Sequence, residues 1–163
     1  IEFADFECPF CRDLYEAIDA IRKSRPKLVK VTFLHYPLDN ACNPQISQAF
    51  HPRACLLAKA AECAHVEGRF FDLAPWLFAN GKEATGDALA THVTTLGMDP
   101  EAFSACLDDE HPAIGGDISK GVKAGVQATP TFFINGRKVE GRRTRAVIEA
   151  MVDALLESST REK

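Results

Sequence analysis

Two cysteines near the start of the chain are spaced for reversible disulfide chemistry. Cys8 and Cys11 stand two residues apart, between an apolar stretch over residues 1–6 and a segment with helical spacing. A helix N-terminus offers free backbone N–H groups and the positive end of the helix dipole, which favour the thiolate, the reactive form of cysteine. Pro9 fits the first helical turn, because its fixed φ suits that turn and its missing N–H costs nothing there.

A zinc site is the alternative for these two thiols, because Cys-x-x-Cys is also half of many zinc sites. The sequence holds no second Cys-x-x-Cys and no pair of histidines three to five residues apart. We therefore favour redox chemistry, and we expect neither a bound metal nor a cofactor. The histidines are scattered and we assign none of them as a ligand or a base: His35, His51, His65, His92 and His111.

Length and composition fit one globular domain, or one domain that carries an insertion. The chain has 163 residues, of which 46% are hydrophobic and 26% charged, and its net charge is −4. Mild acidity without a basic stripe argues against a nucleic-acid partner. The apolar runs are far shorter than the roughly 20 residues of a membrane span. The chain begins inside an expected strand and without Met, so we infer a fragment of a longer precursor.

The elements that must position the thiols form two strand-containing ends around a helical middle. Strands are expected at residues 1–6, 28–34, 131–134 and 137–140, the last two joined by a hairpin turn at Asn135-Gly136. Helices are expected at residues 12–24, 52–66, 70–78 and 143–157. Three further helices are expected to begin at Asp87 as a cap, at Asp99-Pro100 and at Pro112.

A second motif stands far from the cysteines. Thr129-Pro130 directly precedes an expected strand, where a cis bond would make a rigid turn. With the cysteine motif it resembles the thioredoxin superfamily, and within it the DsbA-like branch, through residues 2–11 and 128–136. The resemblance implies an α/β, thioredoxin-like fold with a helical insertion domain. Residues 1–36 and 126–163 would form the thioredoxin-like domain, and residues 37–125 the inserted helical domain.

The resemblance also implies roles for single residues. Cys8 would be the exposed attacking thiol and Cys11 the buried resolving thiol. Pro130 would be the cis-proline facing the disulfide, and Thr129 would offer its backbone to a substrate strand. Glu2 takes the place of the family's buried acid and would accept a proton from Cys11. The alternative for Glu2 is an ordinary exposed strand residue.

Two features depart from the family pattern. Phe10, which with Pro9 would offer apolar surface to a substrate, stands where the strongest oxidants of the branch have a His. We therefore expect less stabilisation of the thiolate, and a redox potential shifted toward reducing by roughly tens of millivolts. The family also has a further strand before the first one expected here.

The remaining four cysteines favour an oxidising compartment. Cys42 and Cys55 flank a stretch with two prolines, and we predict a structural disulfide that closes this loop and contributes about 3 kcal/mol. Cys63 and Cys106 fall on the inward faces of two expected helices. Separate buried thiols are the expectation there, and a second disulfide is the alternative.

The resemblance implies a thiol-disulfide oxidoreductase that exchanges disulfides with cysteine-containing proteins in an extracytoplasmic space, the periplasm or cell envelope. The expected direction is oxidising, and a disulfide reductase or isomerase on the same fold is the first alternative. A non-catalytic metal- or peptide-binding module is the second. Residues 36–39, 42–43 and 51–55 further resemble DsbA-like domains linked to vitamin K epoxide reductase homologues, which implies a quinone-linked membrane partner for reoxidation.

Overall fold

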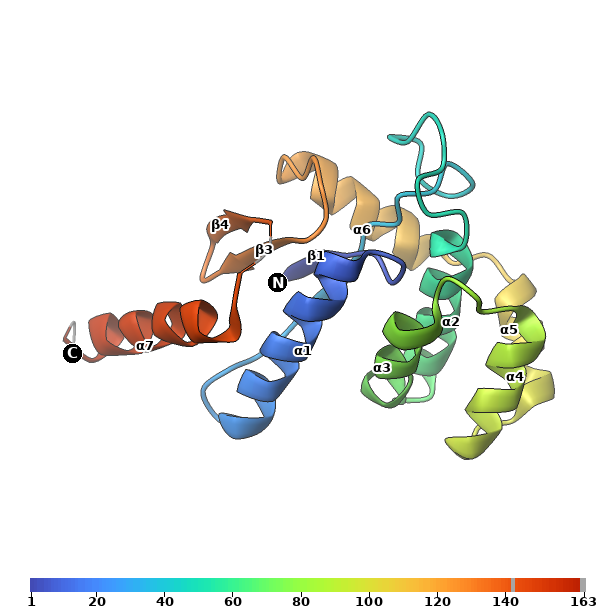
Figure 1. Ribbon diagram of the computed structural model, residues 1–163, viewed down its shortest axis with the longest axis horizontal. Helices are drawn as coiled ribbons and strands as arrows, with labels where there is room; N and C mark the ends of the chain where they lie inside the picture. The colour runs from blue at the N-terminus through green and yellow to red at the C-terminus, as the bar shows by residue number, and fades with distance from the viewer. Residues whose placement is uncertain (142, 162–163) are drawn as a thin grey trace.

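The computed structural model describes residues 1–141 and 143–161 (Figure 1). Four strands and seven helices follow one another along this part of the chain. Their bounds are β1 Glu2–Ala4, α1 Pro9–Ser24, β2 Phe33–His35, α2 Ala54–Val66, α3 Phe70–Asn80, α4 Gly86–Thr95, α5 Pro100–Asp108, α6 Pro112–Lys123, β3 Thr131–Ile134, β4 Arg137–Glu140 and α7 Arg145–Arg161. The chain is therefore an α/β protein, as the sequence predicts.

The strands form one sheet in the order β2-β1-β3-β4. β1 is parallel to β2 and antiparallel to β3, and it pairs Glu2 with Phe33 on one side and with Phe132 on the other. β3 and β4 form the expected hairpin, with Asn135 and Gly136 both at positive φ, at 46° and 81°. The strand that leads into the cysteine motif therefore lies in the interior of the sheet.

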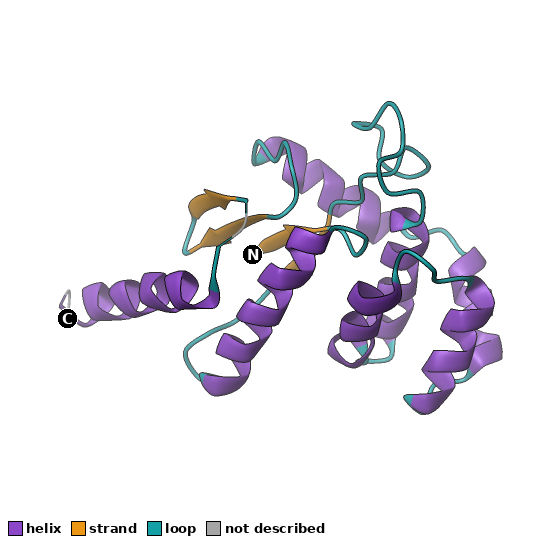
Figure 2. Ribbon diagram, in the orientation of Figure 1, coloured by secondary structure: helices purple, strands orange, loops and turns teal. Residues whose placement is uncertain are grey.

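Helices cover both faces of this sheet (Figure 2). On one face, Leu14 and Ile21 of α1 share a buried cluster with Phe132 of β3 and with Ile148 of α7. On the other face, Phe3 of β1 packs with residues of α6. Successive strand residues point to opposite faces, so Glu2, the neighbour of Phe3, faces the side of α1 and α7. The helices α2–α5 gather at the end of the molecule opposite α7 (Figure 1).

Several element boundaries differ from the expectation. β2 covers Phe33–His35 rather than residues 28–34. Its neighbour β1 begins at Glu2, so the pairing of the two strands starts with the hydrogen bond from the Glu2 N–H to the Thr32 carbonyl. The cap of α4 is Thr85 rather than Asp87, since the Thr85 hydroxyl accepts the N–H of Ala88 at 3.2 Å. The helix expected to begin at Asp99-Pro100 is α5, and Asp99 is its cap.

Two disulfides tie the helical part together. Cys42 and Cys55 form the predicted bridge. Cys63 and Cys106 are also bonded, which corrects the expectation of separate thiols. α2 and α5 pack side by side and bring the two Cα atoms to 6.0 Å, within the normal range for a disulfide. The packing of two helices that are distant in sequence was not readable from their separate patterns.

A separate finding concerns membranes. No helix within the described ranges combines the length and the apolar character that crossing a bilayer requires.

Candidate active site

The cysteine motif lies at the start of α1, which begins at Pro9 rather than at residue 12. Cys8 is the N-cap, with extended backbone angles of −77° and 117°. Its carbonyl accepts the N–H groups of Cys11 and Arg12, both at 3.1 Å, which closes the first turn. Both cysteines are free thiols. The local sequence therefore sets Cys8 directly at the helix N-terminus.

The exposed fraction differs only slightly between the two cysteines. Cys11 is 0% exposed, as expected of a resolving thiol. Cys8 is 4% exposed, which corrects the expectation of an openly exposed thiol. The reason is the loop before β3, since the Cys8 Sγ lies 3.6 Å from the carbonyl oxygen of Thr129, to which the neutral thiol donates.

The surroundings separate the two thiols in acidity. The pKa of Cys8 falls from 9.0 to about 6, chiefly because the thiol of Cys11 donates a hydrogen bond to its sulfur. The backbone N–H groups of Cys11 and Phe10 and the hydroxyl of Thr129 lower it further, against the desolvation that raises it. Burial raises the pKa of Cys11 well above its usual value, and the neighbouring Cys8 adds to this rise. At neutral pH the pair holds one thiolate, on Cys8.

The Thr129-Pro130 loop reaches the motif from 121 positions further along the chain. The peptide bond between Thr129 and Pro130 is cis. The loop is held in place by the Thr131 hydroxyl, which donates to the Ala128 carbonyl at 2.7 Å, and by the Gly141 N–H, which donates to the Pro130 carbonyl at 3.0 Å. The fold therefore brings together the two motifs that the sequence singles out.

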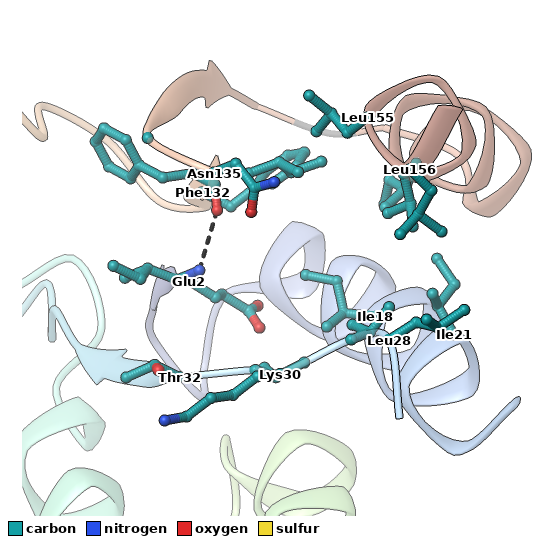
Figure 3. A pocket seen from close by; sticks show the side chains of 18 residues that line it. Glu2, Ile18, Ile21, Leu28, Lys30, Thr32, Phe132, Asn135, Leu155 and Leu156 are labelled. Atoms are coloured by element: carbon teal, nitrogen blue, oxygen red, sulfur yellow. Dashed lines mark hydrogen bonds between the residues drawn. The ribbon is translucent and has the colours of Figure 1, made fainter. Parts of the chain in front are cut away.

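Glu2 is buried, with 1% of its surface exposed. Neither carboxyl oxygen has a hydrogen-bond partner among the described residues. Burial raises the pKa of this carboxyl from 4.5 to about 8, and the nearby terminal ammonium offsets part of the rise. In Figure 3 the carboxyl group points into a cavity of about 420 Å³ lined by Ile18, Ile21 and Leu28, among others. A neutral, protonated Glu2 is therefore the form that this site favours at neutral pH.

A hydrogen-bond network joins the turn before Cys8 to the irregular loop that precedes α2. The buried carboxylate of Asp5 accepts the Glu7 N–H at 2.8 Å and the Leu38 N–H at 2.7 Å. The same carboxylate lies 2.9 Å from Nδ1 of His51. The backbone carbonyl of Asp5 accepts the Cys8 N–H at 3.1 Å. Asp5 thus fixes the active-site turn and anchors His51 to it.

Neither Asp5 nor His51 is a candidate from the sequence. Asp5 stands three residues before Cys8 at a strand end, which is a common place for a turn-forming aspartate. That signal points to a local role for Asp5. Its contact with His51 spans 46 positions and has no signature in either segment.

One group of potential metal ligands comes together among the described residues, at Cys63, Cys106 and His111. Metal ligation requires free thiolates. The sulfurs of Cys63 and Cys106 are bonded to each other. This group is therefore a bridged pair beside a histidine, and it offers no thiolate to a metal in this state.

Comparison with solved structures shows a shared fold. The chain superposes on a thioredoxin-like oxidoreductase from Silicibacter pomeroyi DSS-3 with a TM-score of 0.73 and 18% identity, over 96% of this chain and 84% of that one. It superposes on oxidised BdbD from Bacillus subtilis with a TM-score of 0.73 and 23% identity, over 96% and 85%. For the oxidoreductase DsbA from Xylella fastidiosa the TM-score is 0.67 and the identity 20%, over 96% and 84%.

Comparison of sequences gives a family model and partial matches. The family model described as Thioredoxin matches residues 1–154. A Na⁺/H⁺ antiporter NhaA 3 of Salinispora tropica is 31% identical over 156 residues, which cover 93% of this chain and 22% of the antiporter. An antiporter NhaA of Herminiimonas arsenicoxydans is 28% identical over 94% of this chain and 23% of its own length. The chain thus spans about a fifth of the curated relatives that it matches.

Proposed function

We propose that this chain, which belongs to the thioredoxin family and has the fold of DsbA-type structures, is a thiol-disulfide oxidoreductase acting on cysteine-containing proteins. One observation carries the proposal. Cys8 has a pKa of about 6 at a helix N-terminus, and it lies beside the buried thiol of Cys11 and against the carbonyl of Thr129. A reactive thiolate and a resolving thiol are the two groups that disulfide exchange needs.

The proposed reaction begins with the Cys8–Cys11 pair as a disulfide. A substrate thiolate attacks the Cys8 sulfur, a bond forms between the two sulfurs, and Cys11 leaves as a thiolate. A second substrate thiolate then attacks the substrate sulfur of this mixed disulfide and releases Cys8 as a thiolate. The substrate dithiol loses two electrons and becomes a disulfide, while the enzyme pair gains them. The low pKa of Cys8 makes it a good leaving group in the second step.

The protons in this reaction are assigned to Cys11 and Glu2. Cys11 has a raised pKa, so its departing thiolate takes up a proton. Glu2, neutral in its buried site with a pKa of about 8, is the proposed donor in this direction and the acceptor in reverse. Thr129 is the proposed backbone contact for an extended substrate segment. Phe10, which is 52% exposed, is the proposed apolar contact beside Cys8.

We assign the oxidising direction to the exchange. A thiol whose pKa lies below its ordinary value stabilises the reduced enzyme at neutral pH, and each pKa unit corresponds to about 30 mV of oxidising power for a two-electron couple. The two structural disulfides support an extracytoplasmic location, the periplasm or cell envelope. A quinone-linked membrane protein is the proposed partner for reoxidation, on the resemblance of residues 36–39, 42–43 and 51–55 to domains linked to vitamin K epoxide reductase homologues.

The test uses two single substitutions in the motif. Cys8→Ser is expected to abolish oxidation of a dithiol peptide with glutathione disulfide as the terminal oxidant, because no sulfur remains for the first attack. Cys11→Ser, reduced and mixed with the same peptide in its disulfide form, is expected to accumulate a mixed disulfide between Cys8 and the peptide, detectable by mass spectrometry, because the thiol that completes the reverse reaction is missing. Wild-type turnover by the Cys8→Ser protein would contradict the proposal.

A further inference from the structure

The Cys-Pro-Phe-Cys motif contains no cationic side chain, whereas the hydrogen bonds of Asp5 bring His51 to the turn before it. We propose that His51, held by Asp5, is a positioning residue that supplies this missing positive charge to Cys8 from the loop over residues 37–53. The inference rests on the proposed function, since it assigns a role in tuning the same pair. It concerns a residue outside both motifs.

The first support is the geometry around the carboxylate of Asp5. Asp5 is 2% exposed, and a buried carboxylate is costly unless hydrogen bonds and a counter-charge compensate it. Two backbone N–H groups, of Glu7 and Leu38, supply part of this compensation. His51 Nδ1 at 2.9 Å completes the set. A protonated imidazole at this place is both the third donor and the counter-charge.

The second support is the set of charges that face His51. The active-site turn contributes Asp5, Glu7 and Cys8, and the segment of His51 itself contributes Arg53. The hydrogen bond from Asp5 raises the pKa of His51 most, desolvation opposes it, and the charges of Asp5, Cys8 and Glu7 raise it further. Coupling between two titrating groups is mutual. The geometry points the same way, because the residue whose carboxylate holds His51 at 2.9 Å also accepts the Cys8 N–H at its backbone carbonyl, at 3.1 Å. An imidazolium at this place therefore lies beside the active-site turn and favours the Cys8 thiolate.

The third support is the way in which the loop is fixed. The Leu38 carbonyl accepts the N–H groups of Phe50 and His51 at 3.0 and 3.2 Å. The Glu7 carboxylate accepts the Arg53 N–H at 2.6 Å. The Cys42–Cys55 disulfide then ties the loop to the first turn of α2. His51 is therefore held against the active-site turn by backbone bonds on both sides of it.

The test measures the pKa of Cys8 directly in the reduced full chain. The rate of Cys8 alkylation by iodoacetamide is followed from pH 4 to 9, with the Cys8 peptide quantified by mass spectrometry. His51→Asn keeps an N–H donor for Asp5 and removes the charge. We expect it to raise the pKa of Cys8 by about half a unit to one unit, which lowers the thiolate fraction at pH 6 about two- to fivefold. His51→Arg, a permanent cation, is expected to restore the wild-type value.

The matched control is His65→Asn, at an exposed position in the last turn of α2. It is expected to leave the Cys8 profile unchanged. An unchanged Cys8 pKa in His51→Asn, or an equal shift in His51→Arg, would overturn the inference. Alkylation of Cys8 needs no turnover, so this test can fail or succeed independently of the test of the proposed function. A shifted pKa in a protein that oxidises no dithiol would overturn the proposed function alone, and normal turnover with no shift would overturn this inference alone.

Discussion

Cys8 and Cys11 carry the same functional group, and their different surroundings make them chemically unlike. Cys8 receives hydrogen bonds at the open end of a helix, whereas Cys11 is fully buried within it. The two pKa values therefore move in opposite directions. In the proposed mechanism, this asymmetry determines which sulfur a substrate attacks and which one leaves.

Glu2 leads to a prediction about pH and stability. Its pKa is about 8 in the folded protein and about 4.5 in the unfolded chain, so the folded state binds more protons between these values. Its contribution to stability is fully present below about pH 4.5 and is lost as the pH rises toward 8 and beyond. The loss approaches about 1.4 kcal/mol for each pH unit.

Urea unfolding of the oxidised protein at pH 5 and pH 8.5 tests this, because Cys8 does not titrate in the oxidised form. Glu2→Gln is isosteric and neutral, and it should remove most of the fall in unfolding free energy between the two pH values. Glu101→Gln, at an exposed position of α5, is the matched control. A Glu2→Gln protein with the wild-type fall would show that Glu2 is ionised in the fold.

The sequence was informative about single residues where chemistry is local. The spacing of Cys8 and Cys11 and the Thr129-Pro130 pair are visible in short windows. The contact of His51 with Asp5 is not, because it depends on where a long irregular loop returns to the sheet. The near-complete burial of Cys8 was likewise invisible, since it is caused by a loop more than a hundred positions away.

Helix α6 packs on the sheet through a glycine. A Cβ at Gly121 would lie 2.7 Å from ring carbons of Tyr36 and 3.2 Å from Phe3. Gly121→Ala should therefore destabilise the protein by about 1–3 kcal/mol, as overpacking does. Gly116 lies in the same helix with open space around it. Gly116→Ala should stabilise by about 0.5–1 kcal/mol through helix propensity.

Both substitutions are compared by urea unfolding under the same conditions. Opposite signs are expected although the chemical change is identical. A Gly121→Ala protein as stable as the wild type would mean that α6 does not pack against Tyr36 as described. The spacing of apolar residues predicted α6 but not its contact with Tyr36. A glycine has no side chain whose type would indicate what packs against it.

The two disulfides allow a comparison between loops of different length. Cys42 and Cys55 are 13 positions apart, and Cys63 and Cys106 are 43 apart. On the chain-entropy model their removal as double alanine variants should cost about 3 and about 4 kcal/mol respectively. Loss of the first bridge should also raise the pKa of Cys8, because that bridge holds the loop that carries His51.

Thermal unfolding and the alkylation profile of Cys8 together check this prediction. The Cys63→Ala/Cys106→Ala protein serves as the control for the second effect, since its bridge joins α2 to α5 and not to the loop. An unchanged Cys8 profile after loss of the Cys42–Cys55 bridge would contradict the proposed coupling.

A long helical segment separates two parts of the chain that form one sheet. Five helices, α2–α6, lie between β2 and β3 in sequence, and we propose that residues 37–125 form an inserted helical domain. α6, within this range, also covers one face of the sheet. The sequence predicted the α/β class and the order of elements well. It predicted the ends of strands poorly, because β2 is limited by the length of its neighbour rather than by its own residues.

On this proposed division of the chain, the active site is a composite of both parts. The thioredoxin-like part contributes Cys8, Cys11 and the Thr129-Pro130 loop, and the inserted part contributes His51. The two parts meet at the Asp5 carboxylate, which binds groups from both. Changes in the insertion should therefore alter the redox pair without touching its sulfurs.

The most direct measurement is a redox titration of the full chain in glutathione buffers, with free thiols trapped and assigned by mass spectrometry. We predict that Cys8 and Cys11 are the pair that titrates, while the other two disulfides stay intact. We also predict a midpoint less negative than the value of about −270 mV that is typical of thioredoxin. A midpoint at or below that value would contradict the oxidising assignment. Reduction of another pair while Cys8 and Cys11 stay bonded would contradict the active site itself.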